Sequence, residues 1–237
     1  SLLFVPPAKG GGMEIFMDIV RTQNLKKYFG KGSGQVRAVD GVDLCVEKGK
    51  LTAIIGASGS GKTTLLNLIG GLCQPTEGTV TVDGVDLGTL REDELTVFRR
   101  RKVGLVFQDY RLVPELTVRE NILLPPALDG SLPDAVFFEE LTGLLGLGEK
   151  LDCFPGQLSG GGQQCAAIAR ALITKPSVIL ADEPTGSFDL KTSQNVAGLL
   201  KMTTEICRQT LIMITHNLQI AQLADHVVHL QDGRIVK

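Results

Sequence analysis

The sequence predicts an α/β fold: a core with a parallel sheet, a small antiparallel β subdomain and an inserted helical subdomain. Apolar runs of strand length alternate with helical patterns, which is typical of parallel strands joined by crossover helices. Four such runs begin at Leu51, Val103, Ser177 and Thr210. A chain of 237 residues can bury one large core, or a core with a subdomain.

The antiparallel subdomain is predicted from the first part of the chain. Between residues 17 and 46, β-like runs flank the turn-prone segment GKGSG, which favours a small antiparallel sheet. The strand that begins at Leu51 then leads through a glycine-rich turn into a helical pattern. Asp83–Gly84 and Asp232–Gly233 each predict a hairpin, because Asp-Gly supplies the conformation that tight turns need.

The middle of the chain, about residues 109 to 172, is predicted to form the helical subdomain. It has no apolar run of the kind that forms a buried strand, and Pro114, Pro125, Pro126 and Pro133 interrupt its first part. A new helix pattern begins at Ser159. We assign residues 13–237 to one domain that includes this insertion.

The first 12 residues, SLLFVPPAKGGG, carry two prolines and three consecutive glycines, which disfavour a helix or a central strand. We interpret them as a leader or an expression remnant. No apolar stretch approaches the roughly 18 residues that a membrane span needs, which predicts a soluble chain.

The charge and cysteine content limit the class of partner and compartment. With 24 basic and 26 acidic residues, the chain has no excess of positive charge, so nucleic acid is not a predicted partner. Its five cysteines form no C-x-x-C pair, and their odd number leaves at least one unpaired within the chain. This usage is typical of a reducing, cytosolic compartment.

Residues 56–63 fit the phosphate-loop pattern G-x-x-x-x-G-K-[ST] between a predicted strand and a predicted helix. Glycines let the backbone N–H groups turn inward around a β-phosphate, and the helix adds its positive end. Lys62 is expected to reach the β- and γ-phosphates, and the Thr63 hydroxyl to bind Mg²⁺. A chance glycine-rich turn is the alternative. The expected nucleotide contacts of this segment are Gly56, Ser58, Gly59, Ser60, Gly61, Lys62, Thr63 and Thr64.

Asp182 and Glu183 follow the apolar run VILA, at the end of a strand where ligands bind in open α/β sheets. Asp182 is positioned to hold Mg²⁺, and Glu183 is then available as the general base that polarises the attacking water. A strand that ends in solvated acids is the alternative, which the phosphate loop disfavours.

The segment LSGGGQQ, residues 158–164, predicts a second anion site. Ser159 is a good N-cap, and each glycine after it costs up to about 1 kcal/mol in a helix relative to alanine. This cost suggests that the backbone approaches another group closely, and the start of a helix offers N–H groups to an anion.

The order and spacing of these motifs resemble those of ABC-transporter ATPases, over nearly everything after Met17. The stretches FRRRKVGLVFQDYRLVPELTVRENILLP, ADEPTG and MITHN are most similar to subunits that serve macrolide, lipoprotein-release and antimicrobial-peptide-resistance permeases. The resemblance implies an ATPase that closes as a homodimer around two ATPs with Mg²⁺. Its implied partner is a membrane-spanning permease, which would hold the chain at the cytoplasmic face of the cell membrane.

The same resemblance implies roles for further residues. Gln108 matches the glutamine that contacts Mg²⁺ or the attacking water, and His216 matches the histidine that contacts the γ-phosphate. Phe29 matches the aromatic residue that stacks on adenine, with Tyr28 as the alternative. Ser159, Gly160 and Gly161 match the signature contacts to the nucleotide of the opposite subunit, and Asp189 matches the aspartate of the adjoining loop. His226 and His229 match nothing catalytic, and we interpret them as structural.

Three positions depart from the family pattern. Gly162 stands where Gln or Glu is usual, Cys165 where Arg is usual, and Ser187-Phe188 where Asn-Leu is common. We expect these departures to weaken the signature helix or the dimer contacts. Gly162→Gln with Cys165→Arg is expected to raise ATPase activity.

Two other outputs are compatible with the same site. One is a non-transport module that signals to or drives a membrane partner, similar to the ABC ATPase of cell division. The other is a soluble ABC protein of translation or DNA repair, but those usually carry two ATPase units or long insertions that this sequence lacks. The membrane protein that co-purifies with the chain would distinguish them.

Overall fold

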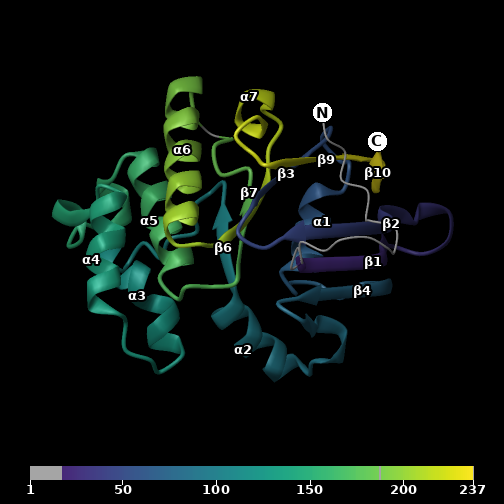
Figure 1. Ribbon diagram of the computed structural model, residues 1–237, viewed down its shortest axis with the longest axis horizontal. Coiled ribbons are helices and arrows are strands. Elements are labelled where there is room, and N and C mark those ends of the chain that lie inside the picture. Colours follow the sequence, from purple (N-terminus) through teal and green to yellow (C-terminus); the bar gives the residue numbers. More distant parts are fainter. Residues whose placement is uncertain (1–17, 187, 237) are drawn as a thin grey trace, which may run out of the picture.

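The computed structural model describes residues 18–186 and 188–236, which form two sheets with helices packed around them (Figure 1). The proposed leader, residues 1–12, and Ser187 lie outside the described residues. Among the residues described, no helix is both long enough and apolar enough to cross a membrane.

The smaller sheet is antiparallel and has the strand order β2-β1-β4-β5. Its strands are β1 (Asp18–Phe29), β2 (Val36–Glu47), β4 (Glu77–Val82) and β5 (Val85–Asp86). The predicted antiparallel pairing of the first two strands is confirmed. Asp83 and Gly84 join β4 to β5 with φ of 50° and 77°, the left-handed conformation that the hairpin prediction required.

The larger sheet has the order β10-β9-β3-β8-β7-β6. Its strands are β3 (Leu51–Ile55), β6 (Val103–Phe107), β7 (Val178–Asp182), β8 (Thr210–Ile214), β9 (His226–Gln231) and β10 (Arg234–Val236). All pairs are parallel except β9 with β10, which form the predicted terminal hairpin. The carboxyl ends of five strands therefore meet along one edge of the sheet.

The central strands are apolar throughout because both faces of the sheet are covered. In β7, Ile179 and Ala181 belong to one buried cluster, and Val178 and Leu180 belong to the other. The first cluster joins the sheet to α5, α6 and α3, and the second joins it to α1 and the antiparallel sheet. Alternation of two buried faces explains why the sequence shows continuous apolar runs rather than alternating ones.

The helices lie beside the sheets (Figure 1). They are α1 (Lys62–Ile69), α2 (Glu92–Lys102), α3 (Val118–Leu128), α4 (Ala135–Leu144), α5 (Gly160–Leu172), α6 (Leu190–Ile206) and α7 (Leu218–Ala221). Short 3₁₀ turns cover Gly32–Gly34, Leu87–Thr89, Gly148–Lys150 and Pro155–Gln157.

The predicted helical stretch, residues 109–172, holds α3, α4 and α5 and no strand. Its limits as a subdomain stay a prediction, since α5 also packs on β6 and β7. The interruption expected at Pro125 and Pro126 is wrong, because both lie inside α3. The helix accommodates them in its last turns, where the carbonyls of both prolines accept the N–H of Asp129, and the capping box of Thr117 and Glu120 secures its start.

A glycine in β6 determines how closely α5 can approach the sheet. A Cβ atom at Gly104 would lie 2.5 Å from the carbonyl oxygen of Ala171 and 2.6 Å from Cδ1 of Ile179. We expect Gly104→Ala to lower the free energy of unfolding by about 1–3 kcal/mol, since backbone must shift. Urea denaturation would measure this. Gly143→Ala in α4 is the matched control, because nothing lies within 4 Å, and it is expected to raise stability by up to about 1 kcal/mol.

Candidate functional site

The phosphate loop joins β3 to α1 and packs against its neighbours with no room for side chains at two positions. A Cβ atom at Gly56 would lie 2.1 Å from the carbonyl oxygen of Leu230, and one at Gly61 would lie 1.9 Å from that of Ala38. Gly61 also has a φ of 100°, which favours glycine. β2 and β9 thus hold the loop in shape from both sides.

Lys62 begins α1 and folds back over the loop. Its Nζ donates to the carbonyl oxygens of Gly56 at 2.9 Å and Ala57 at 2.8 Å, and the residue is only 7% exposed. Ala57, Ser58 and Gly59 of the loop are exposed. A cation held at a helix start beside an exposed loop is suited to bind an anionic group.

The other residues predicted to contact nucleotide differ in their exposure. Thr63 is exposed and Thr64 is half-buried on the first turn of α1. The Ser60 hydroxyl is buried and has no hydrogen-bond partner within the described residues. The accessible and the unpartnered polar groups both fit a loop that receives a polar ligand.

Thr63 and Asp182 lie together at the sheet edge, with the Thr63 hydroxyl 3.3 Å from Oδ1 of Asp182. Burial raises the pKa of the Asp182 carboxyl, the Thr63 hydrogen bond lowers it, and the charge of Glu183 raises it. A half-buried carboxylate beside a second carboxylate favours a nearby cation. No cluster of three or more His, Cys, Asp or Glu in the described ranges could hold a metal alone, so phosphate oxygens would have to complete an Mg²⁺ site, as is common.

Glu183 and His216 extend from neighbouring strand ends and meet. Nδ1 of His216 lies 3.1 Å from Oε2 of Glu183. Glu183 has a φ of 45°, and its N–H donates to the carbonyl oxygen of Ile214, so the turn after β7 is bonded to β8. This geometry orients the carboxylate toward the same edge as Asp182.

Gln108 follows β6 and reaches the same place. A Cβ atom at Gly186 would lie 2.9 Å from Nε2 of Gln108 and 3.3 Å from Oε2 of Glu183, so both side chains crowd against this glycine. An open cavity of about 750 Å³ has Thr63, Gln108, Asp182 and Glu183 in its lining. The phosphate loop, the acidic end of β7 and Gln108 are predicted separately, and their residues share one cavity.

The two candidate aromatic residues lie differently. The Tyr28 hydroxyl donates to Asp40, whose backbone N–H donates to Gly233, and the Gly233 N–H donates in turn to Ser60 of the phosphate loop. Phe29 is 47% exposed, with the Lys27 ammonium 5.3 Å from its ring centre.

Sequence reasoning missed Asp40, because no motif surrounds it. Its carboxylate accepts from Tyr28 and also pairs with Arg234.

The signature residues start α5, outside the lining of the 750 Å³ cavity. Ser159 caps the helix by accepting the N–H of Gly162 at 3.2 Å. Asp189 caps α6 by accepting the N–H of Thr192 at 3.0 Å, and this backbone hydrogen bond lowers the pKa of its carboxyl. The structure thus brings Lys62, Thr63, Gln108, Asp182, Glu183 and His216 together, while Ser159, Gly160, Gly161 and Asp189 do not line the cavity that Gln108, Asp182 and Glu183 share.

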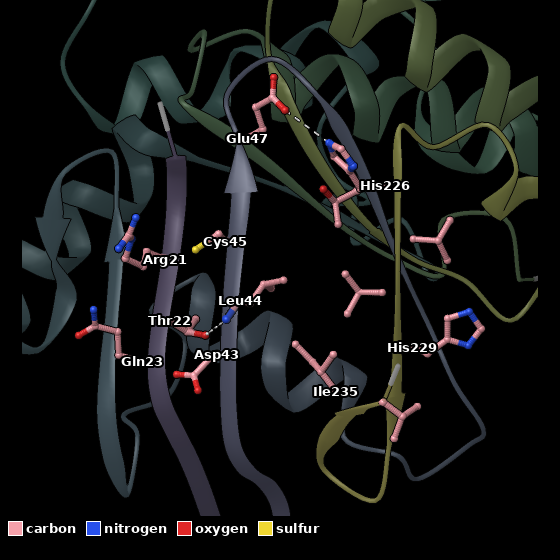
Figure 2. Close-up of a pocket in the computed structure, with 14 residues that line it drawn as sticks. Arg21, Thr22, Gln23, Asp43, Leu44, Cys45, Glu47, His226, His229 and Ile235 are labelled. Carbon is pink, nitrogen blue, oxygen red and sulfur yellow. Dashed lines mark hydrogen bonds and ion pairs between the residues drawn. The ribbon is translucent and has the colours of Figure 1, made fainter. Parts of the chain in front are cut away.

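A second hollow, of about 300 Å³, lies between the antiparallel sheet and β9. Figure 2 shows Cys45 and Glu47 on one side of it and His226 and His229 on the other. Nε2 of His226 lies 3.5 Å from Oε2 of Glu47. None of the predicted catalytic or nucleotide-binding residues lines this hollow, and the interpretation of His226 as structural stays a prediction.

Comparison with known proteins decides the family. The family model described as ABC transporter matches residues 39–186, and a bacitracin export ATP-binding protein of Halalkalibacterium halodurans is 39% identical over 92% of this chain and 87% of its own length. The chain belongs to the ABC transporter family. Its nucleotide-binding and ATP-hydrolysing class follows from this membership, and the predicted P-loop fold is confirmed.

Other members add to the comparison. This ABC chain is 43% identical, over 92% of its length, to a macrolide export ATP-binding/permease protein of Aeromonas hydrophila, but it spans only 34% of that relative. A dimeric, post-hydrolysis structure of the ATP-binding cassette MJ0796, bound to ADP and Pi, superposes with a TM-score of 0.82 at 38% identity. That match covers 92% of this chain and 97% of the cassette.

The structure separates two departures of the signature helix that the sequence treats alike. Gly162 lies in the first turn, and a Cβ atom there would meet Cβ of Leu158 and Oγ of Ser159 at 3.4 Å, an ordinary contact. Cys165 is 7% exposed within the core cluster, and burial raises the pKa of its thiol. An arginine could pack at position 165 only by burying a cation near Lys150.

We therefore expect Gly162→Gln to raise the melting temperature by about 2–4 °C, since it adds up to about 1 kcal/mol. Cys165→Arg is expected to lower it, because an unpaired charge would be buried. Thermal unfolding of the two single variants would measure both shifts. A Cys165→Arg chain as stable as the parent would contradict the argument from burial.

Proposed function

We propose that the chain is the ATP-hydrolysing subunit of an ABC transporter, which binds Mg²⁺ and ATP, closes as a homodimer around two ATPs and drives a separate membrane-spanning permease. The observation that carries this proposal is the convergence of Lys62, the Thr63–Asp182 pair and the Glu183–His216 pair at one sheet edge. A cation, a metal-binding pair and a positioned carboxylate are the parts that phosphoryl transfer to water requires.

The binding roles follow from chemistry at these atoms. Lys62 can exchange its bonds to Gly56 and Ala57 for bonds to phosphate oxygens, because both carbonyls lie at the loop itself. The Thr63 hydroxyl and the Asp182 carboxylate are hard oxygen ligands of the kind that Mg²⁺ prefers. When bound, Mg²⁺ would neutralise phosphate charge. Its presence would also favour the ionised form of Asp182, which burial alone disfavours.

Glu183 is the proposed general base, because it follows the metal-binding Asp182 and lines the same cavity. His216 holds the Glu183 carboxylate through Nδ1 and would orient it, while its other face is available to the γ-phosphate. Gln108, which crowds against Gly186 beside Glu183, would contact the metal or the attacking water. Base assistance of this kind contributes about 10²–10⁴-fold in rate.

The second half of each site is proposed to come from another copy of the chain. Ser159, Gly160, Gly161 and Asp189 are placed at the starts of α5 and α6, where backbone N–H groups favour anions. They do not line the cavity that holds Glu183. A head-to-tail pair would bring them to the nucleotide of the other copy, and the dimeric cassette with 38% identity supports this arrangement.

The transported substrate is proposed from relatives. Two of them are named for macrolide export and for bacitracin export, which supports an export role with antimicrobial compounds or peptides as cargo. A lipoprotein-handling permease is the related possibility within the same group. The permease would hold the chain at the cytoplasmic face of the membrane, and no role with nucleic acid is proposed.

Glu183→Gln provides the main test of mechanism. The amide preserves the size of the side chain but is a poor proton acceptor, so we expect turnover to fall about 10²–10⁴-fold while ATP binding is retained. ATP with Mg²⁺ should then hold the variant as a dimer, and ADP should not. Single-turnover hydrolysis and sedimentation with each nucleotide would measure this.

Lys62→Ala is the matched control, because it removes the phosphate cation and should weaken ATP binding itself. Near-parental hydrolysis by Glu183→Gln would remove Glu183 from the base role and leave His216 as the next candidate. A Glu183→Gln chain that binds ATP but stays monomeric at saturation would contradict the two-copy site for the isolated subunit.

The adenine contact is tested by comparing two adjacent residues. The sequence favours Phe29, but hydrogen bonds link Tyr28 through Asp40 and Gly233 to the phosphate loop. We expect Tyr28→Ala to weaken ATP binding about fivefold to a hundredfold, as loss of base stacking does, and Phe29→Ala to weaken it less. Titration with a fluorescent ATP analogue would rank them. Tyr28→Phe, which keeps the ring, should stay close to the parent, and the reverse ranking would restore Phe29.

A further inference from the structure

The segment after β6 has an unusual backbone that needs support from elsewhere. Tyr110 and Arg111 are consecutive and have φ of 58° and 48°. Left-handed backbone costs about 1–2 kcal/mol for each residue that is not glycine. Tyr110 lies two residues after Gln108, so whatever holds this segment in place also limits where Gln108 can lie.

Arg170, on α5, supplies part of that support. Its Nη1 donates to the carbonyl oxygen of Arg111 at 2.5 Å, and its Nη2 donates to that of Tyr110 at 2.8 Å. Arg170 is half-buried, and this burial lowers the pKa of its guanidinium. Charge-assisted bonds to two carbonyls offset that cost, so α5 and the segment after β6 are joined firmly.

The side chain of Tyr110 supplies a second link, to the loop that precedes α6. Its ring stacks on that of Phe188, with the ring centres 6.2 Å apart and the planes at 13°. Phe188 directly precedes Asp189, the N-cap of α6. The stack therefore connects the segment that carries Gln108 to the loop that carries Asp189.

The start of α5 closes this cluster. A Cβ atom at Gly160 would lie 2.9 Å from the Tyr110 hydroxyl and 3.0 Å from Cε1 of Phe188. The first residue of the signature helix thus packs against both rings and has to be small. Three segments far apart in sequence, near residues 110, 160 and 188, meet at one aromatic pair.

We propose that Tyr110 and Phe188 are positioning residues. Their stack, supported by the Arg170 bonds and by Gly160, makes three segments move as one unit. These segments are the Gln108 segment, the start of the signature helix and the Asp189 loop. This inference rests on the proposed function. Gln108 serves the nucleotide of its own chain, and Gly161 and Asp189 serve that of the other copy. The stack then couples the two nucleotide sites within each chain.

The experiment is a double-mutant cycle on the full chain with Tyr110→Leu, Phe188→Leu and both together. Each substitution keeps an apolar side chain and removes one ring of the stack. The interaction free energy of an aromatic pair corresponds to a factor of about three to ten in a rate constant. We therefore expect each single variant to lower kcat by that factor. KM for ATP should change less than twofold. The double variant should be no slower than the slower single variant.

Two further variants separate positioning from packing. Phe188→Tyr retains a stacking ring and should recover most of the parental kcat. Phe154→Leu removes an exposed ring outside the cluster and should leave kcat unchanged. Effects on kcat that multiply in the double variant would overturn the proposal, and so would a loss of thermal stability with no loss of kcat in folded protein. A parent chain without ATPase activity would instead count against the proposed function, so the two failures are distinguishable.

Discussion

The register of three parallel strands determines where the chemistry of this molecule can take place. Asp182 pairs with Phe107 of β6 on one side and with Ile214 of β8 on the other. The chain therefore leaves all three strands at the same level, which places Gln108, Glu183 and Thr215 side by side. A slip by one residue would turn each following side chain to the opposite face of the sheet. Because both faces are buried, such a slip would also mismatch the two apolar clusters.

The same register explains why a poorly solvated carboxylate is tolerated at the sheet edge. Asp182 ends a fully apolar strand, and its burial disfavours the charged form. The Lys62 charge and the Thr63 hydroxyl, both from the start of α1, favour that form. Since the close packing of Gly56 and Gly61 against β9 and β2 fixes α1, the rigid loop also fixes the environment of the acid. A carboxylate that is partly removed from water beside a hydroxyl and a second carboxylate suits the proposed metal-binding role.

Some parts of the fold could be predicted because local sequence dictates them. Glycines with positive φ mark the phosphate loop and the turn at Asp83–Gly84, and continuous apolar runs mark β3, β7 and β8. The helix α2 was missed because its sequence, EDELTVFRRRK, is highly charged. Its basic residues make bonds that no local pattern reveals: Arg99 donates to the Gly71 carbonyl, Arg100 and Arg101 to Asp129, and Lys102 to Asp83. The long helix α6 is not among the elements that the sequence predicts either.

The candidate site also combines residues that local motifs predict with contacts between segments far apart in the sequence. Lys62, Thr63, Asp182 and Glu183 lie within motifs whose spacing reports their chemistry. The bonds from Arg170 to Tyr110 and Arg111 span about 60 positions, and the stack of Tyr110 on Phe188 joins residues that lie still farther apart in the sequence. Such contacts depend on the packing of α5 against β6, where a Cβ atom at Gly104 would lie 2.5 Å from the carbonyl oxygen of Ala171. The close approach of one helix to the sheet therefore brings the signature segment beside the Gln108 segment.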